Sequence, residues 1–254
     1  MNCPSCQHRM ESVADMCPLC GWSFAMQLPS QGQSLVRPAE RPKLQCEVEL
    51  AITIDRTGSS QTFQTGIAKT CGIILKQGAV KARSMRCWVA SHGDLDKGQA
   101  FIIHTDGGTP EQALADVEGI VYGGGGEPPE HHLDAVESLL NSVPWTADAS
   151  RARGAIIAFT TSDTKPARSG ITAAELGAAI RERGILFYLV SEITPTLLEL
   201  ATAAEGLVFR IRNDPDPVEL QRIAAQVAAS IVATVASGGT VPMTVTPPPS
   251  LDQQ

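Results

Sequence analysis

Aromatic residues and positive charge are both scarce in this chain of 254 residues. Phe, Trp and Tyr together make up 4% of it, which argues against a stacking platform for single-stranded nucleic acid. The 20 Lys and Arg residues are outnumbered by 27 Asp and Glu residues, and the net charge of −7 disfavours a large phosphate-binding surface. A nucleic-acid partner is therefore not expected.

Long hydrophobic runs are absent as well. The longest uncharged stretch, residues 223–250, contains many small and polar residues, whereas a membrane-spanning helix needs about 20 mostly apolar residues. The first residues of the chain show no apolar segment of the signal-peptide type. With 43% hydrophobic and 19% charged residues, the composition is typical of a soluble globular protein. We expect a cytoplasmic protein that does not enter a membrane.

Cysteine is unevenly distributed. Four of the seven cysteines lie within the first 20 residues in two Cys-x-x-Cys pairs, whereas a secreted disulfide framework is more often even in number and spread along the chain. Four thiolates are the number that a tetrahedral structural zinc requires. A redox function for one pair is an alternative, but no βαβ pattern surrounds it. We therefore predict a zinc ribbon over residues 1–24, with Zn²⁺ bound by Cys3, Cys6, Cys17 and Cys20.

The predicted ribbon is acidic. Arg9 is outnumbered by Glu11 and Asp15, and four thiolates leave the zinc complex with two more negative charges. Such a module is poorly suited to following phosphates along a nucleic acid. Protein contact or a purely structural role is the better expectation.

The rest of the chain divides into three parts. Residues 25–44 are polar and interrupted by prolines, which is typical of a linker. Residues 237–254 contain four prolines without a helical or strand period, which predicts a disordered tail. Between them, residues 45–236 alternate short apolar runs with helical patterns. This alternation predicts an α/β fold, a doubly wound and mainly parallel sheet covered by helices on both faces.

Individual elements follow from the periodicity of the apolar residues. We expect strands at 47–54, 85–90, 100–104, 155–159, 185–190 and 207–211, and the clearest helices at 171–183, 195–203 and 215–236. Cys46, Cys71 and Cys87 fall on apolar segments and are predicted to be small core residues. Ligands of such sheets bind at the carboxyl ends of the strands, where we expect the functional site.

The first strand runs into a motif of oxygen-bearing side chains. Asp55, Thr57 and Ser59 alternate in the sequence Asp-Arg-Thr-Gly-Ser-Ser. A turn can direct their carboxylate and two hydroxyls at one point, which suits a hard divalent cation such as Mg²⁺. Alternatively, Ser59 or Ser60 caps the following helix, so the motif alone is not specific.

In its context, the motif resembles the metal-ion-dependent adhesion site (MIDAS) of von Willebrand factor type A (vWA) domains, where Asp-x-Ser/Thr-x-Ser follows the first strand. The resemblance covers about residues 46–236 and implies a Rossmann-like vWA fold of the bacterial intracellular type, with Mg²⁺ or Mn²⁺ at the MIDAS. The loop Gly-Gly-Gly-Gly-Glu-Pro-Pro-Glu is similar to the acidic loops of bacterial vWA proteins and integrin β subunits. By this resemblance Glu130 is a metal ligand, and Glu127 replaces the more usual Asp.

The third element of the motif departs from the family pattern. vWA domains usually have an Asp directly after the fourth strand and a Thr, but this chain reads Phe-Thr-Thr-Ser-Asp and the acid is displaced by about one residue. The resemblance implies that Asp163 assists the metal directly or through a water, or that Ser162 and Thr161 take its place.

The resemblance also implies a non-enzymatic interaction module. A MIDAS with few carboxylates leaves one position of the ion open for an Asp or Glu of a partner protein. In bacteria, this implies an adaptor of AAA+ ATPases, kinases or stress and defence complexes, with the zinc ribbon as a second contact surface. The alternatives are a Mg²⁺-dependent hydrolase that uses the same carboxylates and a zinc-ribbon nucleic-acid binder. We find no triad, cofactor fingerprint or paired carboxylates with a catalytic rationale.

Other polar residues near these motifs are not assigned to the site. His131 and His132 begin a helix and are expected to be exposed. His92, Asp94 and Asp96 lie in a polar segment that is expected to be a solvated loop.

Overall fold

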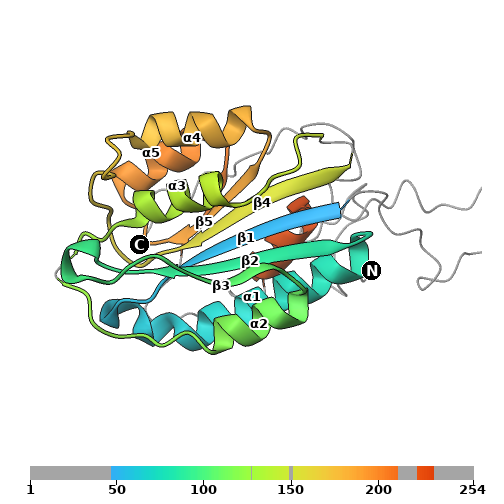
Figure 1. The fold of residues 1–254 in the computed structure, drawn as a ribbon, viewed down its shortest axis with the longest axis horizontal. Helices are drawn as coiled ribbons and strands as arrows, with labels where there is room; N and C mark the ends of the chain where they lie inside the picture. The colour runs from blue at the N-terminus through green and yellow to red at the C-terminus, as the bar shows by residue number, and fades with distance from the viewer. Residues whose placement is uncertain (1–46, 127, 149–150, 211–221, 232–254) are drawn as a thin grey trace, which may run out of the picture.

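One mainly parallel sheet organises the protein (Figure 1). The computed structural model describes residues 47–126, 128–148, 151–210 and 222–231. The predictions for the zinc ribbon, the linker, the C-terminal tail, Cys46 and Glu127 lie outside the described residues.

The described elements alternate as the sequence predicts. The strands are β1 (Glu47–Asp55), β2 (Met85–His92), β3 (Ile102–Gly108), β4 (Ala152–Phe159), β5 (Leu186–Ser191) and β6 (Leu207–Arg210). The helices are α1 (Gln64–Lys81), α2 (Pro110–Glu118), α3 (His132–Ser142), α4 (Ala173–Glu182), α5 (Pro195–Ala203), the 3₁₀ helices η3 (Gly58–Phe63) and η4 (Leu95–Lys97), and a further helix at residues 222–231.

The central strand β1 determines where the loops meet. The order across the described strands is β3-β2-β1-β4-β5-β6, and β1 pairs in parallel with both β2 and β4. Asp55, the last residue of β1, lies opposite His92, the last residue of β2. Because β1, β2, β4 and β5 run in the same direction, the loops that follow them emerge at one edge of the sheet. The predicted mainly parallel α/β architecture is confirmed.

Strand β3 corrects the prediction for residues 100–104. It covers Ile102–Gly108 and pairs antiparallel with β2 at the edge of the sheet. Ile102 and Ile103 are exposed, because an edge strand need not bury both of its faces. The apolar residues therefore indicate the strand but not its extent.

The two faces of the sheet are covered by different helices (Figure 1). Along β1, Val48, Leu50, Ile52 and Ile54 face a core with α1, α2 and the helix at 222–231. Ala51 belongs instead to a second core with α3, α4 and α5. This alternation is the period of two expected of a strand that is buried on both faces.

Local sequence fixes where several helices begin. Thr109 and Thr172 form capping boxes with Gln112 and Glu175, respectively, so that each hydroxyl accepts a backbone N–H that the helix leaves unpaired. In α5, the Thr194 side chain accepts from the Leu197 amide, and Pro195 is the first helical residue.

The helix predicted at 215–236 is described over residues 222–231, and the rest of that prediction lies outside the described residues. Ile223, Val227 and Ile231 are buried in the core with α1, and the hydroxyl of Tyr188 donates to Ser230 Oγ at 3.0 Å. Of the cysteines, Cys71 and Cys87 are buried core residues, as expected. None of the helices in the described part of the chain combines the length and the apolar character needed to cross a membrane.

Candidate metal centre

Asp55 anchors a turn that gathers three oxygen-bearing side chains. It is buried at the end of β1, and its Oδ1 accepts hydrogen bonds from the Thr57 amide (2.9 Å) and the Thr57 hydroxyl (2.8 Å). The Thr57 hydroxyl also lies 3.0 Å from Ser59 Oγ. The structure therefore brings together Asp55, Thr57 and Ser59, the three residues of the predicted motif.

Glu130 supplies a second carboxylate from the loop before α3. It is only 1% exposed, yet neither carboxylate oxygen makes a hydrogen bond of good geometry within the described residues. Burial, together with the negative charges of Asp94 and Asp55, raises the pKa of Glu130 to about 7, although the Lys165 charge and the Gly126 amide act in the opposite direction. A buried carboxylate without partners is unfavourable in its ionised form. A cation next to it would remove that penalty.

A glycine explains how Glu130 approaches the motif. A Cβ atom added to Gly125 would lie 3.0 Å from Thr57 Cβ and 3.3 Å from Glu130 Oε1. Gly125 also has a φ of 86°, in the left-handed region that favours glycine. The missing side chain of Gly125 thus leaves room for both Thr57 and Glu130 to approach the loop backbone.

The loop after β4 presents Thr161 to Asp55. The Thr161 hydroxyl lies 3.5 Å from Asp55 Oδ2 and 2.8 Å from the hydroxyl of Ser60. Asp163, the predicted third acid, instead accepts the Thr164 amide at 2.9 Å. Ser162 points toward His132, 3.1 Å from its Nε2. Among the third-loop residues that the resemblance nominated, Thr161 is the one with a described contact to Asp55.

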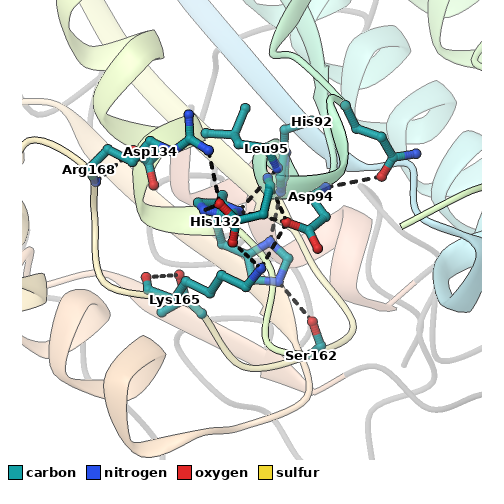
Figure 2. A network of polar contacts seen from close by, with 12 residues as sticks. His92, Asp94, Leu95, His132, Asp134, Ser162, Lys165 and Arg168 are labelled. Carbon is teal, nitrogen blue, oxygen red and sulfur yellow. Dashed lines mark hydrogen bonds and ion pairs between the residues drawn. The ribbon is translucent and has the colours of Figure 1, made fainter. Parts of the chain in front are cut away.

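The expectation that His131 and His132 are exposed is wrong, because each is 3% exposed. His92 is buried as well, in contrast to the predicted solvated loop. His92 Nε2 lies 2.7 Å from His132 Nδ1, and the two rings meet edge to face (Figure 2). Burial lowers the pKa of both rings, that of His92 to about 3, so the pair is uncharged at neutral pH.

The buried histidine pair joins the first and third loops. His92 Nδ1 lies 2.9 Å from the Thr53 hydroxyl on β1, and His132 Nε2 lies 2.6 Å from the Thr160 hydroxyl at the end of β4. Burial opposes ionisation of Asp55, but the positive charge that His132 and His92 take up in acid, together with the Thr57 amide, outweighs it and holds the pKa of Asp55 below its usual value. The polar contacts of this histidine pair were not predicted from the sequence.

A second polar cluster lies close enough to Glu130 for the charge of Asp94 to raise the pKa of Glu130. Figure 2 shows Asp94, Lys165 and Arg168 of this cluster. Asp94 is buried, which corrects the expectation of a solvated loop, whereas Asp96 is exposed. Lys165 Nζ lies 2.8 Å from an oxygen of each, and His131 Nδ1 lies 3.3 Å from Asp94 Oδ1. Arg168 adds an ion pair with Asp96 at 3.0 Å. In this cluster, the carboxylates have cationic partners from the chain itself.

Comparison with solved structures places the fold in a known class. The VWA domain of SpRpn10 superposes with a TM-score of 0.54 at 13% sequence identity, over 70% of this chain and 93% of that one. Proximal thread matrix protein 1 from the mussel byssus gives a TM-score of 0.57 at 12% identity, over 75% of this chain and 47% of that one. A second crystal form of it gives 0.51 at 10% identity. Neither protein-family models nor curated proteins match the sequence.

The described part of the chain therefore has a vWA-like fold. At such low identity, the similarity extends to the fold alone. Within that fold, Asp55 at the end of β1 and the loops before α3 and after β4 lie together, as the structure of this chain itself shows.

Proposed function

We propose that this protein is a non-enzymatic interaction module that binds an Asp or Glu side chain of a partner protein through a divalent cation. Asp55, Thr57, Ser59 and Glu130 would hold the Mg²⁺ or Mn²⁺, and Asp163 or Thr161 would assist from the third loop. The vWA-like fold supports an interaction module, and the geometry around Asp55 supports this ligand set.

The observation that carries the proposal is the unpartnered carboxylate of Glu130. Buried acids normally have hydrogen-bond or charge partners, and neither oxygen of Glu130 has one among the described residues. A hard divalent cation prefers carboxylate and hydroxyl oxygens, which are the groups that Asp55, Thr57, Ser59 and Glu130 would supply. Once bound, the cation would supply positive charge to which a partner carboxylate can coordinate.

Two carboxylates are few for such a site. Asp55 and Glu130 together balance the charge of one divalent cation, and Thr57 and Ser59 contribute neutral oxygens. An added carboxylate from a partner would then be attracted to the cation rather than repelled by an excess of acids. This charge balance favours recognition of an acidic side chain over simple storage of the metal.

The experiment pans a displayed library of random peptides in Mn²⁺ and elutes them with a chelator. We expect the eluted peptides to share an Asp or Glu, and Asp55→Asn to capture none of them. Glu192→Gln is the matched control, since it removes an exposed acid directly after β5, at the same edge of the sheet. Enriched peptides without acidic residues, or capture that survives both Asp55→Asn and the chelator, would contradict the proposal.

For the cellular setting, we propose a cytoplasmic adaptor of the bacterial intracellular type. Its partners would be an AAA+ ATPase, a kinase or a stress or defence complex, and a structural Zn²⁺ ribbon would form a second contact surface. Elemental analysis of reduced protein tests the ribbon, with about one zinc per chain expected and less in Cys17→Ser. Absence of zinc from the reduced wild-type protein would contradict this part of the proposal.

A further inference from the structure

Three side chains that could ligate a metal ion lie close together beside the candidate metal centre, and Lys165 pairs with two of them. Figure 2 shows Lys165 and Asp94 of this cluster. Asp94 and Asp96 come from the β2–β3 connection, and His131 directly precedes α3. One ligand atom from each lies within 4.8 Å of the others. Two carboxylates and an imidazole form a donor set suitable for a divalent transition metal such as Mn²⁺.

The Lys165 ammonium lies between the two carboxylates. Its Nζ is 2.8 Å from Asp94 Oδ1 and 2.8 Å from Asp96 Oδ2, so it can donate a hydrogen bond to each. These hydrogen bonds raise the pKa of Lys165 and lower that of Asp94. The lysine is therefore charged at neutral pH, and a metal ion would have to displace it to reach both acids.

His131 places both of its ring nitrogens near the two acids. Its Nδ1 accepts a hydrogen bond from the Leu95 amide at 3.2 Å and lies 3.3 Å from Asp94 Oδ1, while its Nε2 lies 3.7 Å from Asp96 Oδ1. A metal ion would have to replace one of these contacts to bind the imidazole, just as it would have to displace Lys165 to reach both carboxylates. The cation that the cluster already holds belongs to the chain.

Lys165 also positions the segment that carries Glu130. Its backbone N–H donates to the Glu130 carbonyl at 2.6 Å, while the Glu130 N–H donates to the Asp163 carbonyl at 3.0 Å. The glycine loop is close to the same cluster, because a Cβ atom on Gly126 would lie 2.8 Å from Asp94 Oδ2. Lys165 therefore links Asp94 through its side chain to Glu130 through its backbone.

We propose that Lys165 replaces a second divalent cation: its ammonium occupies a metal position formed by Asp94, Asp96 and His131 and fixes the Glu130 loop without a metal. The inference rests in part on the proposed function, since the first ion is the one assigned to Asp55 and Glu130. A single positive charge also repels that ion less than a second divalent cation would. The outcome is a site that needs one metal ion instead of two.

The test counts the Mn²⁺ ions bound by the full chain, by calorimetry and by electron paramagnetic resonance of free Mn²⁺. Lys165→Met removes the charge while keeping much of the apolar stem, and we expect it to bind one more Mn²⁺ per chain than the wild type. Arg168→Met is the matched control, because it removes the same charge from the exposed edge of the cluster. It should keep the wild-type number. An unchanged number of ions in folded Lys165→Met would overturn the proposal.

Further variants separate this inference from the proposed function. Asp94→Asn combined with Lys165→Met should return to the wild-type number, since one ligand is lost. Asp55→Asn combined with Lys165→Met should keep the additional ion. If Asp55→Asn alone binds as many ions as the wild type while Lys165→Met still gains one, the proposed function fails and the Lys165 inference stands.

Folding of Lys165→Met is informative too. If the variant unfolds in chelator and refolds in Mn²⁺, the ion has taken the place of the ammonium, which supports the proposal. If it remains unfolded at saturating Mn²⁺, a cation does not replace the ammonium and the proposal is overturned.

Discussion

Glu130 and Asp94 are two buried carboxylates on neighbouring loops, and their surroundings differ. Both are 1% exposed. Asp94 accepts hydrogen bonds from Lys165 and from the Asp96 amide, whereas the oxygens of Glu130 have no such partners among the described residues. Lys165 lowers the pKa of Asp94, while burial raises the pKa of Glu130 to about 7.

The difference separates a structural cluster from a candidate binding site. Where the chain supplies its own cation, the carboxylate is already satisfied and serves to hold loops together. Where no described residue pairs directly with the carboxylate, as at Glu130, the carboxylate can bind a cation from solution. The exposed fractions of Glu130 and Asp94 are equal, so burial alone does not distinguish the two carboxylates. They differ in whether a described residue forms a direct hydrogen bond or ion pair with the carboxylate.

The largest expected effect concerns Asp55. Asp55→Asn should weaken Mn²⁺ binding about 100-fold or more, because even indirect supports of metal ligands commonly contribute 10- to 100-fold. Asn keeps an oxygen that can accept the Thr57 amide and hydroxyl, so the free energy of unfolding without metal should change by less than about 1 kcal/mol. Calorimetric titration and chemical denaturation measure the two quantities.

A variant on the opposite face of the sheet provides the converse control. Ile223 is fully buried, and Ile223→Ala should cost about 2–5 kcal/mol of stability while the folded protein binds Mn²⁺ as the wild type does. Loss of Mn²⁺ affinity in folded Ile223→Ala, or unchanged Mn²⁺ affinity in Asp55→Asn, would show that the assignment of Ile223 to the core and Asp55 to the metal site is wrong.

The next largest effect is the pH dependence of metal binding. Glu130 must be ionised to ligate a cation, and its pKa in the metal-free protein is about 7. The Mn²⁺ affinity should therefore rise about tenfold per pH unit up to about pH 7 and level off above it. Glu130→Gln should bind more weakly and lose this slope, whereas a slope that persists in Glu130→Gln would point to another titrating group.

The fold and the convergence of Asp55, Thr57 and Ser59 were predictable because their signals are local. The apolar runs at 47–54 and 185–190 match β1 and β5 within one residue at either end, and the helix predicted at 195–203 is α5. The hydroxyls of Thr57 and Ser59 converge because the turn after β1 is set by neighbouring residues. Each of these features depends on a few consecutive positions.

The histidine pair was missed because its burial depends on segments about 40 residues apart, although a signal existed. On β2, His92 follows Trp88 and Ala90 at a period of two, and both of these belong to the core on the α3 side. On α3, His132 lies four residues before the core residue Val136. The strand period on β2 and the helical period on α3 both place these histidines on the side that faces the core. Their polar side chains nevertheless led to the prediction that they are exposed to solvent.

The partners of the acidic side chains could not be predicted from the sequence. Nothing local in the sequence shows that Lys165 reaches back about 70 positions to Asp94, or that no residue in the described part of the chain forms such a direct pair with Glu130. Similarly, the displaced Asp163 could not be distinguished from Thr161 without the backbone of the third loop. Such pairings are properties of the folded chain.

The smallest expected effect is on stability, and it compares the two carboxylates directly. Without metal, Glu130 keeps a proton in the folded chain between pH 4.5 and about 7 that it releases in the unfolded chain, so its contribution to stability is lost as the pH rises through this window. Asp94 has a pKa below 3.8, so its contribution to stability is present at neutral pH and is lost only as the pH falls below that value.

Thermal melts in chelator, from about pH 3 to about pH 8, should therefore show opposite trends for Glu130→Gln and Asp94→Asn. Glu130→Gln should melt above the wild type at neutral pH and with it near pH 4.5, while Asp94→Asn should melt below the wild type at neutral pH, with a gap that narrows in acid. Glu192→Gln should follow the wild type throughout, and parallel curves for Glu130→Gln and the wild type would mean that Glu130 is already paired in the metal-free protein.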